Sequence, residues 1–300
     1  MVAADAEGGP TGSCALPVAL KVTAALAFLT SGSFQDAVSL GAGVSQSAVS
    51  AAIHTVCGSL VRHADEHVAF PSSPRRRLRA QQDFRAACGL PRVLGAVDCT
   101  HVQLRAPPTR PLAYVNRKGA HSVNIQVTCD ANRLVTHVCA RYPGSTRDAR
   151  ILANSALPAA FRGHAAADGC LVGDDAYPLK TWLLTPYAAP ATPGQRAFNR
   201  ALGQARAVID RTLAALKARF RCLDRSCGTL QYSPQRVSAF FVACCVLHNM
   251  AARTGGALDL PEAALEDFRR REAELHAPFA GEEDAEARER RDLEAQRLAP

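Results

Sequence analysis

Three aspartates stand where a folded chain could bring their carboxylates together. Asp98 ends the apolar run 93–97, and Asp174 follows the apolar run 170–172 after one glycine. Asp210 comes later, with 35 residues between it and Asp174, beside Ile209. Divalent cations such as Mg²⁺ and Mn²⁺ prefer oxygen ligands supplied by several rigid elements. These residues therefore predict a divalent-metal site.

The elements that must position these aspartates follow from apolar spacing. Strands are expected at 93–98, 121–130, 134–142 and 170–173, with 101–105 continuing or pairing with the first. Helices are expected at 146–154 (capped by Ser145), 199–220 and 237–251. This order predicts a three-layer α/β fold with a mixed sheet. Asp210 flanks the helical stripe formed by Ile209, Leu213, Leu216 and Phe220, so it can face the strand ends.

The N-terminal part is expected to be helical after a disordered stretch at 1–15. A first helix is expected at 16–29, and 31–61 has the form of a helix-turn-helix. There Ser33 caps a helix at 34–40, glycines at 41 and 43 make the turn, and Ser45 caps the second helix. The apolar side of that helix is Val49, Ile53, Val56 and Leu60, and its polar face is Ser45, Gln46, Ser47, Ser50 and His54. An ordinary helical hairpin is the alternative to DNA binding through Gln46 and Ser47.

A basic linker is expected at 66–92, with a short helix at 81–88. Its run Arg75, Arg76, Arg77 could contact phosphates or act as a nuclear localisation signal, or it could be a solvated basic surface. Near the candidate site, Arg206, Arg211 and Lys217 lie on the helix of Asp210 and could meet nucleic-acid phosphate.

The charge of the chain is divided unevenly. The formal net charge is +8, but residues 260–300 carry 12 acidic and 7 basic side chains. A basic body with an acidic tail fits a polyanionic partner, although a generally positive surface explains it equally well. The 11 cysteines mostly sit in apolar runs, without a CxxC pair, which favours reduced core residues. No apolar run is long enough to span a membrane, and the start lacks the pattern of a signal peptide, so no membrane partner is expected.

Several motifs taken together resemble the Harbinger-type transposases and the nucleases derived from them, over about residues 17–252. The motifs are Asp98-Cys99-Thr100-His101, the run from Tyr114 to Gly119 with Arg117 and Lys118, Pro143-Gly144-Ser145 with Asp148, Gly173-Asp174, Val208 to Phe220 with Arg221-Cys222-Leu223, and Ala243 to Asn249. The resemblance implies a ribonuclease H-like fold and a DDE endonuclease that cuts DNA phosphodiesters. It places Asp98, Asp174 and Asp210 in an acidic triad that binds two Mg²⁺ or Mn²⁺ ions, with Asp148 as a further acidic position.

In such a site Asp98 is expected to bridge the ions, Asp174 to bind one and Asp210 the other. The family position of Asp210 usually holds glutamate, so this side chain is one methylene shorter. That departure keeps a second hypothesis open, in which the chain is an inactive DNA-binding or scaffold protein with the transposase fold. A nucleotide-binding enzyme is disfavoured because no Gly-rich phosphate loop follows a strand. The resemblance further implies a nuclear protein, also present in the cytoplasm, with a Myb-like DNA-binding partner, and leaves a homo-oligomer open.

Other readings of single residues are weaker. Asp148 could be a first-turn helix residue, Asp175 a turn residue, and His101 a phosphate contact or a packing residue. Zinc ligation by Cys222, Cys227, Cys244, Cys245 and His248 is disfavoured by their spacing. We therefore expect a disordered start at 1–15, a helix-turn-helix-like module at 16–65, the linker at 66–92, a nuclease domain at 93–252 and an acidic tail at 253–300.

Overall fold

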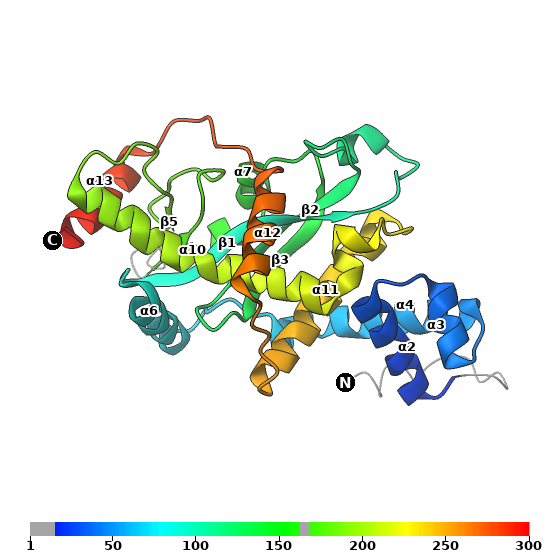
Figure 1. The fold of residues 1–300 in the computed structure, drawn as a ribbon. Coiled ribbons are helices and arrows are strands. Elements are labelled where there is room, and N and C mark those ends of the chain that lie inside the picture. The colour runs from blue at the N-terminus through cyan, green and yellow to red at the C-terminus, as the bar shows by residue number, and fades with distance from the viewer. Residues whose placement is uncertain (1–15, 163–168, 300) are drawn as a thin grey trace.

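A five-stranded mixed sheet forms the centre of the molecule (Figure 1). The computed structural model describes residues 16–162 and 169–299, so the expected disorder of 1–15 falls outside the described residues. The strands are β1 (Val93–Gln103), β2 (Ser122–Cys129), β3 (Val135–Pro143), β4 (Cys170–Val172) and β5 (Leu183–Leu184), and their order is β3-β2-β1-β4-β5. β1, β2 and β3 pair antiparallel, whereas β4 and β5 run parallel to β1. This confirms the α/β class with a mixed sheet.

The register of β1 and β4 brings the two strand-end aspartates to one edge. Ala96 pairs with Val172, so Asp98 and Asp174 each stand two residues beyond the same pair of a parallel ladder. A bulge occurs between Val93 and Gly95, where the strands approach closely. A Cβ on Gly95 would lie 2.9 Å from Thr128 Cγ2 and 3.0 Å from the carbonyl oxygen of Cys129. Glycine at this position therefore lets β1 fit between its neighbours.

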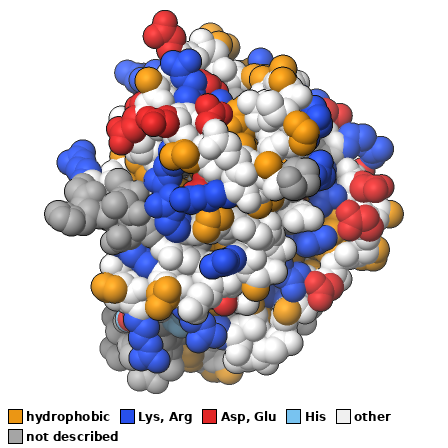
Figure 2. Space-filling model, turned by 90° about the vertical axis from the view of Figure 1, so that its left-hand side faces the viewer, with side chains coloured by type: hydrophobic (Ala, Val, Ile, Leu, Met, Phe, Trp, Pro, Cys, Tyr) orange, Lys and Arg blue, Asp and Glu red, His pale blue; other side chains and the backbone are white. Residues whose placement is uncertain are grey.

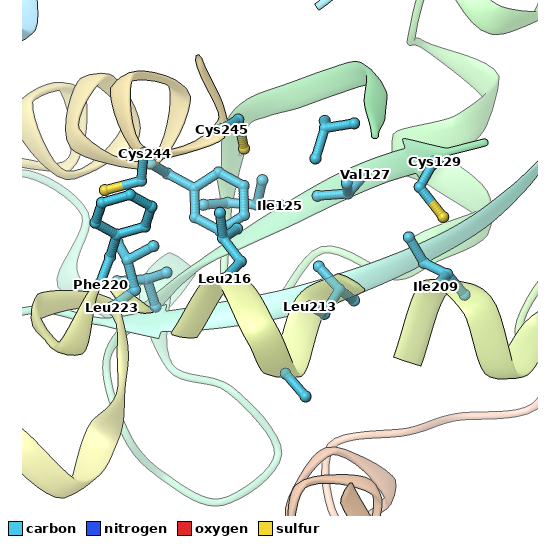
Figure 3. Packing of buried hydrophobic residues seen from close by; sticks show 14 of the residues in the cluster. Ile125, Val127, Cys129, Ile209, Leu213, Leu216, Phe220, Leu223, Cys244 and Cys245 are labelled. Atoms are coloured by element: carbon cyan, nitrogen blue, oxygen red, sulfur yellow. The ribbon is translucent and has the colours of Figure 1, made fainter. Parts of the chain in front are cut away.

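Helix α10 (Pro193–Arg219) carries Asp210 across the sheet. It begins six residues earlier than expected, because Thr192 and Gln195 form a capping box and Pro193 occupies the first turn. Figure 3 shows Ile209, Leu213 and Leu216 of α10 packed toward the β2 side chains Ile125, Val127 and Cys129. Full burial of one such leucine contributes roughly 1.5–3 kcal/mol. The expected apolar stripe is confirmed, and it fixes which way Asp210 faces.

The N-terminal helices share this core. They are α2 (Val18–Ser31), α3 (Gln35–Ala42), α4 (Gln46–Arg62) and α5 (Ala64–His67). The expected apolar positions of α4 are all buried, and they join α11 (Pro234–Arg253) and the sheet in one cluster. Ser45 caps α4 as expected, whereas Phe34 rather than Ser33 precedes α3, which runs on through Gly41. Gly32, at φ +68, lets the end of α2 pass close to Arg221.

Four further short helices lie between residues 111 and 227. They are η1 (Pro111–Tyr114), η2 (Arg221–Leu223), η3 (Arg225–Cys227) and α8 (Leu157–Ala160). A second apolar cluster, including Leu94, Leu171 and Phe161, lies apart from the main core and contains residues of α7 (Asp148–Ala153) and α8. The sheet is thus packed on both sides.

The helices α6, α12 and α13 also differ from the sequence-based expectation. α6 (Pro74–Cys88) starts seven residues before the expected helix at 81, so the arginine run of the expected linker is helical. Ser73 caps it, and Ala80, Phe84 and Cys88 supply a buried side that contacts β1. The acidic tail contains α12 (Glu262–Ala273) and α13 (Ala285–Arg297). α13 packs on α10, and Figure 1 shows α12 crossing α10 in orange.

Charge is distributed over the surface. Figure 2 shows the α13 side of the molecule, where Lys and Arg side chains are spread among neutral and hydrophobic ones, with Asp and Glu mainly toward the edges. Among residues 16–162 and 169–299, no single helix is long and apolar enough to cross a membrane. α3 and α4 reach that length and apolarity only as a pair bent by 103°.

Candidate metal centre

The four sequence-predicted aspartates line one cavity of about 310 Å³. Asp98 comes from β1, Asp148 from the first turn of α7, Asp174 from the end of β4, and Asp210 from the middle of α10. Four elements thus converge, as expected from the two strand ends and the inward side of α10. The remaining lining residues are Cys99, His101, Asp175, Arg206, Leu213, Phe268, Arg269, Glu272, Ala273, Leu275 and His276.

Three of the four aspartates are oriented by a hydrogen bond from the backbone or an amide to one carboxylate oxygen. The backbone N–H of Cys99 donates to Asp98 Oδ1 at 2.7 Å, and that of Ala176 donates to Asp174 Oδ1 at 3.0 Å. Asn124 Nδ2 of β2 donates to Asp148 Oδ1 at 2.8 Å. Each of these bonds fixes a carboxylate plane and leaves its second oxygen for another partner.

Arg206 is the cation that two of these second oxygens share. Its Nη2 lies 3.4 Å from Asp98 Oδ2 and 3.5 Å from Asp174 Oδ2. Arg206 stands one helical turn before Asp210, on the same side of α10. Burial alone would lower the pKa of Arg206, but the charges of Asp98, Asp174 and Asp210 outweigh it and raise that pKa. One guanidinium therefore sits at the centre of the acidic cluster.

The electrostatics of the cluster favour additional positive charge. Burial raises the pKa of Asp98 well above its ordinary value, and the neighbouring charge of Asp174 raises it further. Burial likewise raises the pKa of Asp148 and of Asp210. A raised pKa means that these clustered carboxylates keep protons at a higher pH than usual, because too little positive charge lies near them. Hard oxygen donors from four rigid elements fit divalent ions, so the residues present match the metal that the sequence predicts.

Residues from α12 and the loop after it close the cavity. Arg269 Nε donates to Asp210 Oδ2 at 3.1 Å. His276 Nδ1 lies 3.2 Å from Asp174 Oδ2, and its Nε2 lies 2.6 Å from Asp175 Oδ1. Despite the burial of Asp174, the hydrogen bond from His276 and the charge of Arg206 lower its pKa. The bond to Asp174 raises the pKa of His276 to about 9.

Asp175 and His101 are placed beside the aspartate cluster. Asp175 is half exposed and forms, with Asp174 and His276, a group whose ligand atoms lie within 4.8 Å of one another. His101 Nδ1 lies 2.9 Å from the hydroxyl oxygen of Ser122, and burial lowers its pKa to about 4. A neutral His101 tied to the sheet fits a packing role better than a phosphate contact.

The zinc alternative finds no support among the described residues. His248 Nε2 donates to the carbonyl oxygen of Arg133 at 3.0 Å, on the inner side of α11. Cys222, Cys244 and Cys245 are buried in the main core, as expected of reduced core cysteines.

Of the residues predicted to meet DNA, Arg206 lines the cavity, whereas those of α4 and α6 do not. Gln46 and Ser47 are exposed at the start of α4, and Gln46 Nε2 donates to Gln35 Oε1 at 2.8 Å. Arg75 and Arg76 are exposed on α6, while Arg77 donates to the carbonyl oxygen of Pro71. These positions are compatible with DNA contact.

Arg117 and Lys118 are exposed in the loop before β2 and contact the segment that closes the cavity. Arg117 bonds the carbonyl oxygen of His276, and Lys118 pairs with Glu274. They therefore lie beside the metal centre through that segment.

Sequence reasoning missed Arg269, Glu272 and His276 at the cavity, and it did not give Arg206 its place between the aspartates. Arg206 could have been found, because a residue four positions before Asp210 must share its side of the helix. The other three lie in the acidic tail and meet their partners only through the fold, so no local signal marks them.

Comparisons with known proteins show which family the chain resembles. Residues 97–249 match the family described as DDE superfamily endonuclease. The chain is 42% identical over 235 residues to "Putative nuclease HARBI1" of Rattus norvegicus, and 40% identical to the Homo sapiens protein of the same name. Each alignment covers 78% of this chain and 67% of the relative. "Protein ALP1-like" of Arabidopsis thaliana is 27% identical over 281 residues, which cover 88% of this chain and 65% of that protein. No solved structure matches.

Proposed function

Because the chain belongs to the DDE superfamily endonucleases, with a ribonuclease H-like fold, we propose that it is a divalent-metal-dependent endonuclease that hydrolyses DNA phosphodiester bonds. The observation that carries this proposal is the meeting of Asp98, Asp148, Asp174 and Asp210 in one cavity. Four carboxylates from separate elements that converge on one cavity repel one another, and divalent cations would neutralise that repulsion.

The proposed ligands are the carboxylate oxygens that now face Arg206, His276 and Arg269, and a bound cation would compete with these side chains. Asp98, Asp174 and Asp210 would hold two Mg²⁺ or Mn²⁺ ions, with Asp148 as a further ligand. When bound, such ions neutralise charge at the attacking and leaving oxygens of an in-line displacement. The chain itself keeps the ligands in position: the N–H groups of Cys99 and Ala176 and the amide of Asn124 fix one oxygen of three carboxylates.

Arg206 has a separate role in this proposal. Its guanidinium neutralises Asp98 and Asp174 when no metal is bound, and on metal binding it would stay within the cavity that it lines. A fixed guanidinium beside the ligands would attract and orient a phosphate of the DNA strand.

One observation favours the alternative of an inactive DNA-binding protein. Asp210 is shorter than the usual glutamate, and its Oδ2 is bonded to Arg269. In an inactive protein, Arg269 and Arg206 would permanently neutralise the aspartates, and the fold would be kept without metal. The two hypotheses differ in whether metal and cleavage activity are retained.

The test is cleavage of supercoiled plasmid DNA in Mg²⁺ and in Mn²⁺, together with calorimetric titration of Mn²⁺ into the protein. We expect metal-dependent nicking and Mn²⁺ binding by the wild type, and neither in Asp98→Asn, which keeps the shape of the side chain. Asp267→Asn is the matched control, because Asp267 pairs with Arg270 and Arg271 of its own helix and does not line the cavity. Mn²⁺ binding without cleavage would favour the inactive protein, and absence of both would remove the metal site.

The remaining partners and the location are part of the same proposal. DNA would contact the polar start of α4 and the arginines of α6, in a nuclear protein that is also present in the cytoplasm. A Myb-like protein would assist DNA binding.

A further inference from the structure

Residues 262–276, here called the covering segment, carry charges opposite to those of the rest of the chain, here called the body, at five positions between 269 and 276. Its bases face body acids, and its acids face body bases. The pairs are Arg269 with Asp210, Arg271 with Asp224, Glu272 with Lys217, Glu274 with Lys118 and Arg225, and His276 with Asp174. The segment lies C-terminal to residues 97–249, which match the endonuclease family.

Glu272 occupies a site built from two buried donors. Lys217 Nζ donates to Glu272 Oε1 at 2.9 Å, and Thr100 Oγ1 donates to Glu272 Oε2 at 2.9 Å. Lys217 is 6% exposed and Thr100 is fully buried. Lys217 Nζ also donates to the carbonyl oxygen of His101 at 3.1 Å, which fixes its position. Lys217 and Thr100 thus each donate to one oxygen of the Glu272 carboxylate. The same two donors could bind the two non-bridging oxygens of a DNA phosphodiester.

The basic side chains continue beyond Lys217. A small cavity beside Glu272 is lined by Lys118, Lys217 and Arg225, among others. Glu274 pairs with Lys118 and, at 3.5 Å, with Arg225. Successive phosphates of a DNA strand, like these two carboxylates, present a row of anions. The body therefore carries a short basic track that leads away from the metal centre.

We propose that Thr100, Lys217, Lys118 and Arg225 form a phosphate-binding track for the DNA strand that enters the metal centre, and that Glu272 and Glu274 occupy it when DNA is absent. That the ligand is DNA rests on the proposed function. A buried lysine needs an anionic partner, so displacement of Glu272 requires another anion to replace it. A DNA phosphate supplies that anion.

The covering segment is held in a way that permits this exchange. Its buried apolar side chains are Leu265 and Phe268, both before Arg269, and the Lys217 ammonium lies 5.6 Å from the centre of the Phe268 ring. From Arg269 onward its described contacts with the body are mostly ionic, and those are the contacts that salt and competing phosphates weaken. The end of α12 can thus leave while its start stays docked.

The experiment measures DNA affinity of the full chain without cleavage, by fluorescence anisotropy of a labelled 30-base-pair duplex in Ca²⁺ at several salt concentrations. Glu272→Gln should bind at least about 5-fold more tightly than wild type, with a salt slope steeper by about one unit because one more phosphate is neutralised. The matched control is Glu266→Gln, which removes the same charge from an exposed position on the same helix.

Equal gains for Glu272→Gln and Glu266→Gln would overturn the proposal. A second variant, Glu272→Gln with Lys217→Gln, should lose the gain, and a double variant that keeps the whole gain would also overturn it. Its thermal melting would be compared with wild type, because Lys217 is buried. Hydrogen exchange at 269–276 should become faster on addition of the duplex, and unchanged exchange there would contradict displacement. Because none of these measurements uses cleavage, an inactive enzyme would leave their outcomes readable.

Discussion

Arg206 is the cation that contacts two carboxylates of the acidic cluster and reduces their mutual repulsion when no metal is bound. It contacts Asp98 and Asp174 through a single nitrogen atom, and His276 is a second partner of Asp174. Removing one partner from a buried ion pair leaves charges uncompensated, which costs more than the pair itself contributes.

Arg206→Met should therefore destabilise the metal-free protein by about 3 kcal/mol. Mn²⁺ should restore much of that loss, because the cation replaces the missing guanidinium. Scanning calorimetry with and without Mn²⁺ measures both effects. Arg200→Met, exposed on the same helix, is the control and should change neither. A loss of the same size with and without Mn²⁺ would mean that Arg206 acts only by packing.

Asp210 separates the two functional hypotheses. In an active site, Asp210→Ala should lower cleavage by at least about 100-fold, since a lost metal ligand removes several kcal/mol of charge stabilisation. Asp210→Glu should keep or raise activity, because glutamate is the usual residue and reaches further. The measurement is cleavage of supercoiled DNA in Mg²⁺ and Mn²⁺. Cleavage that survives Asp210→Ala would show that Asp210 is not a ligand, whereas activity gained only in Asp210→Glu would identify an inactive scaffold.

At the level of elements, the sequence predicts positions well where neighbouring residues in the chain are buried together. Asp98 and Asp174 could be predicted because each follows an apolar run, and Asp210 because it borders the stripe of Ile209 and Leu213. α12 and α13 could not, because each is polar and is held by contacts with residues far away in the chain. β5 has only two residues, which is too short for alternation to mark it. The sequence alone therefore could not predict that the covering segment lies over the metal centre.

The start of α4 carries the predicted DNA contact. Ser47 is exposed there, so a carboxylate at that position would meet DNA phosphate without disturbing the core. Ser47→Glu should weaken binding of a DNA duplex several-fold while thermal melting stays unchanged, because like charges repel. Ala27→Glu, exposed on α2, adds the same charge away from this surface. If the two variants bind DNA equally well, α4 is an ordinary helical hairpin.

For the whole molecule, the decisive feature is that the N-terminal helices are not packed as a separate unit. Ile53 of α4, Phe241 of α11 and Ile125 of β2 belong to the same apolar cluster. The sequence predicts a helical module at 16–65 that is distinct from the α/β part of the chain. The shared cluster instead predicts that damage to α4 reaches the sheet. Deleting this module would then damage the metal centre as well, and deletion cannot isolate its role in DNA binding.

The single tryptophan allows a direct test of this coupling. Trp182 stacks on Phe161 with ring centres 5.0 Å apart, in the second apolar cluster and remote in the chain from α4. Ile53→Ala removes a fully buried side chain and should cost about 2–5 kcal/mol. If the molecule unfolds as one unit, the denaturant midpoint followed by Trp182 fluorescence should fall together with the midpoint followed by circular dichroism. Leu40→Ala is the control in the same region, because Leu40 is 85% exposed and its loss should move neither midpoint. A Trp182 midpoint that stays in place while part of the helical signal is lost early would show that α2 to α4 unfold independently of the sheet.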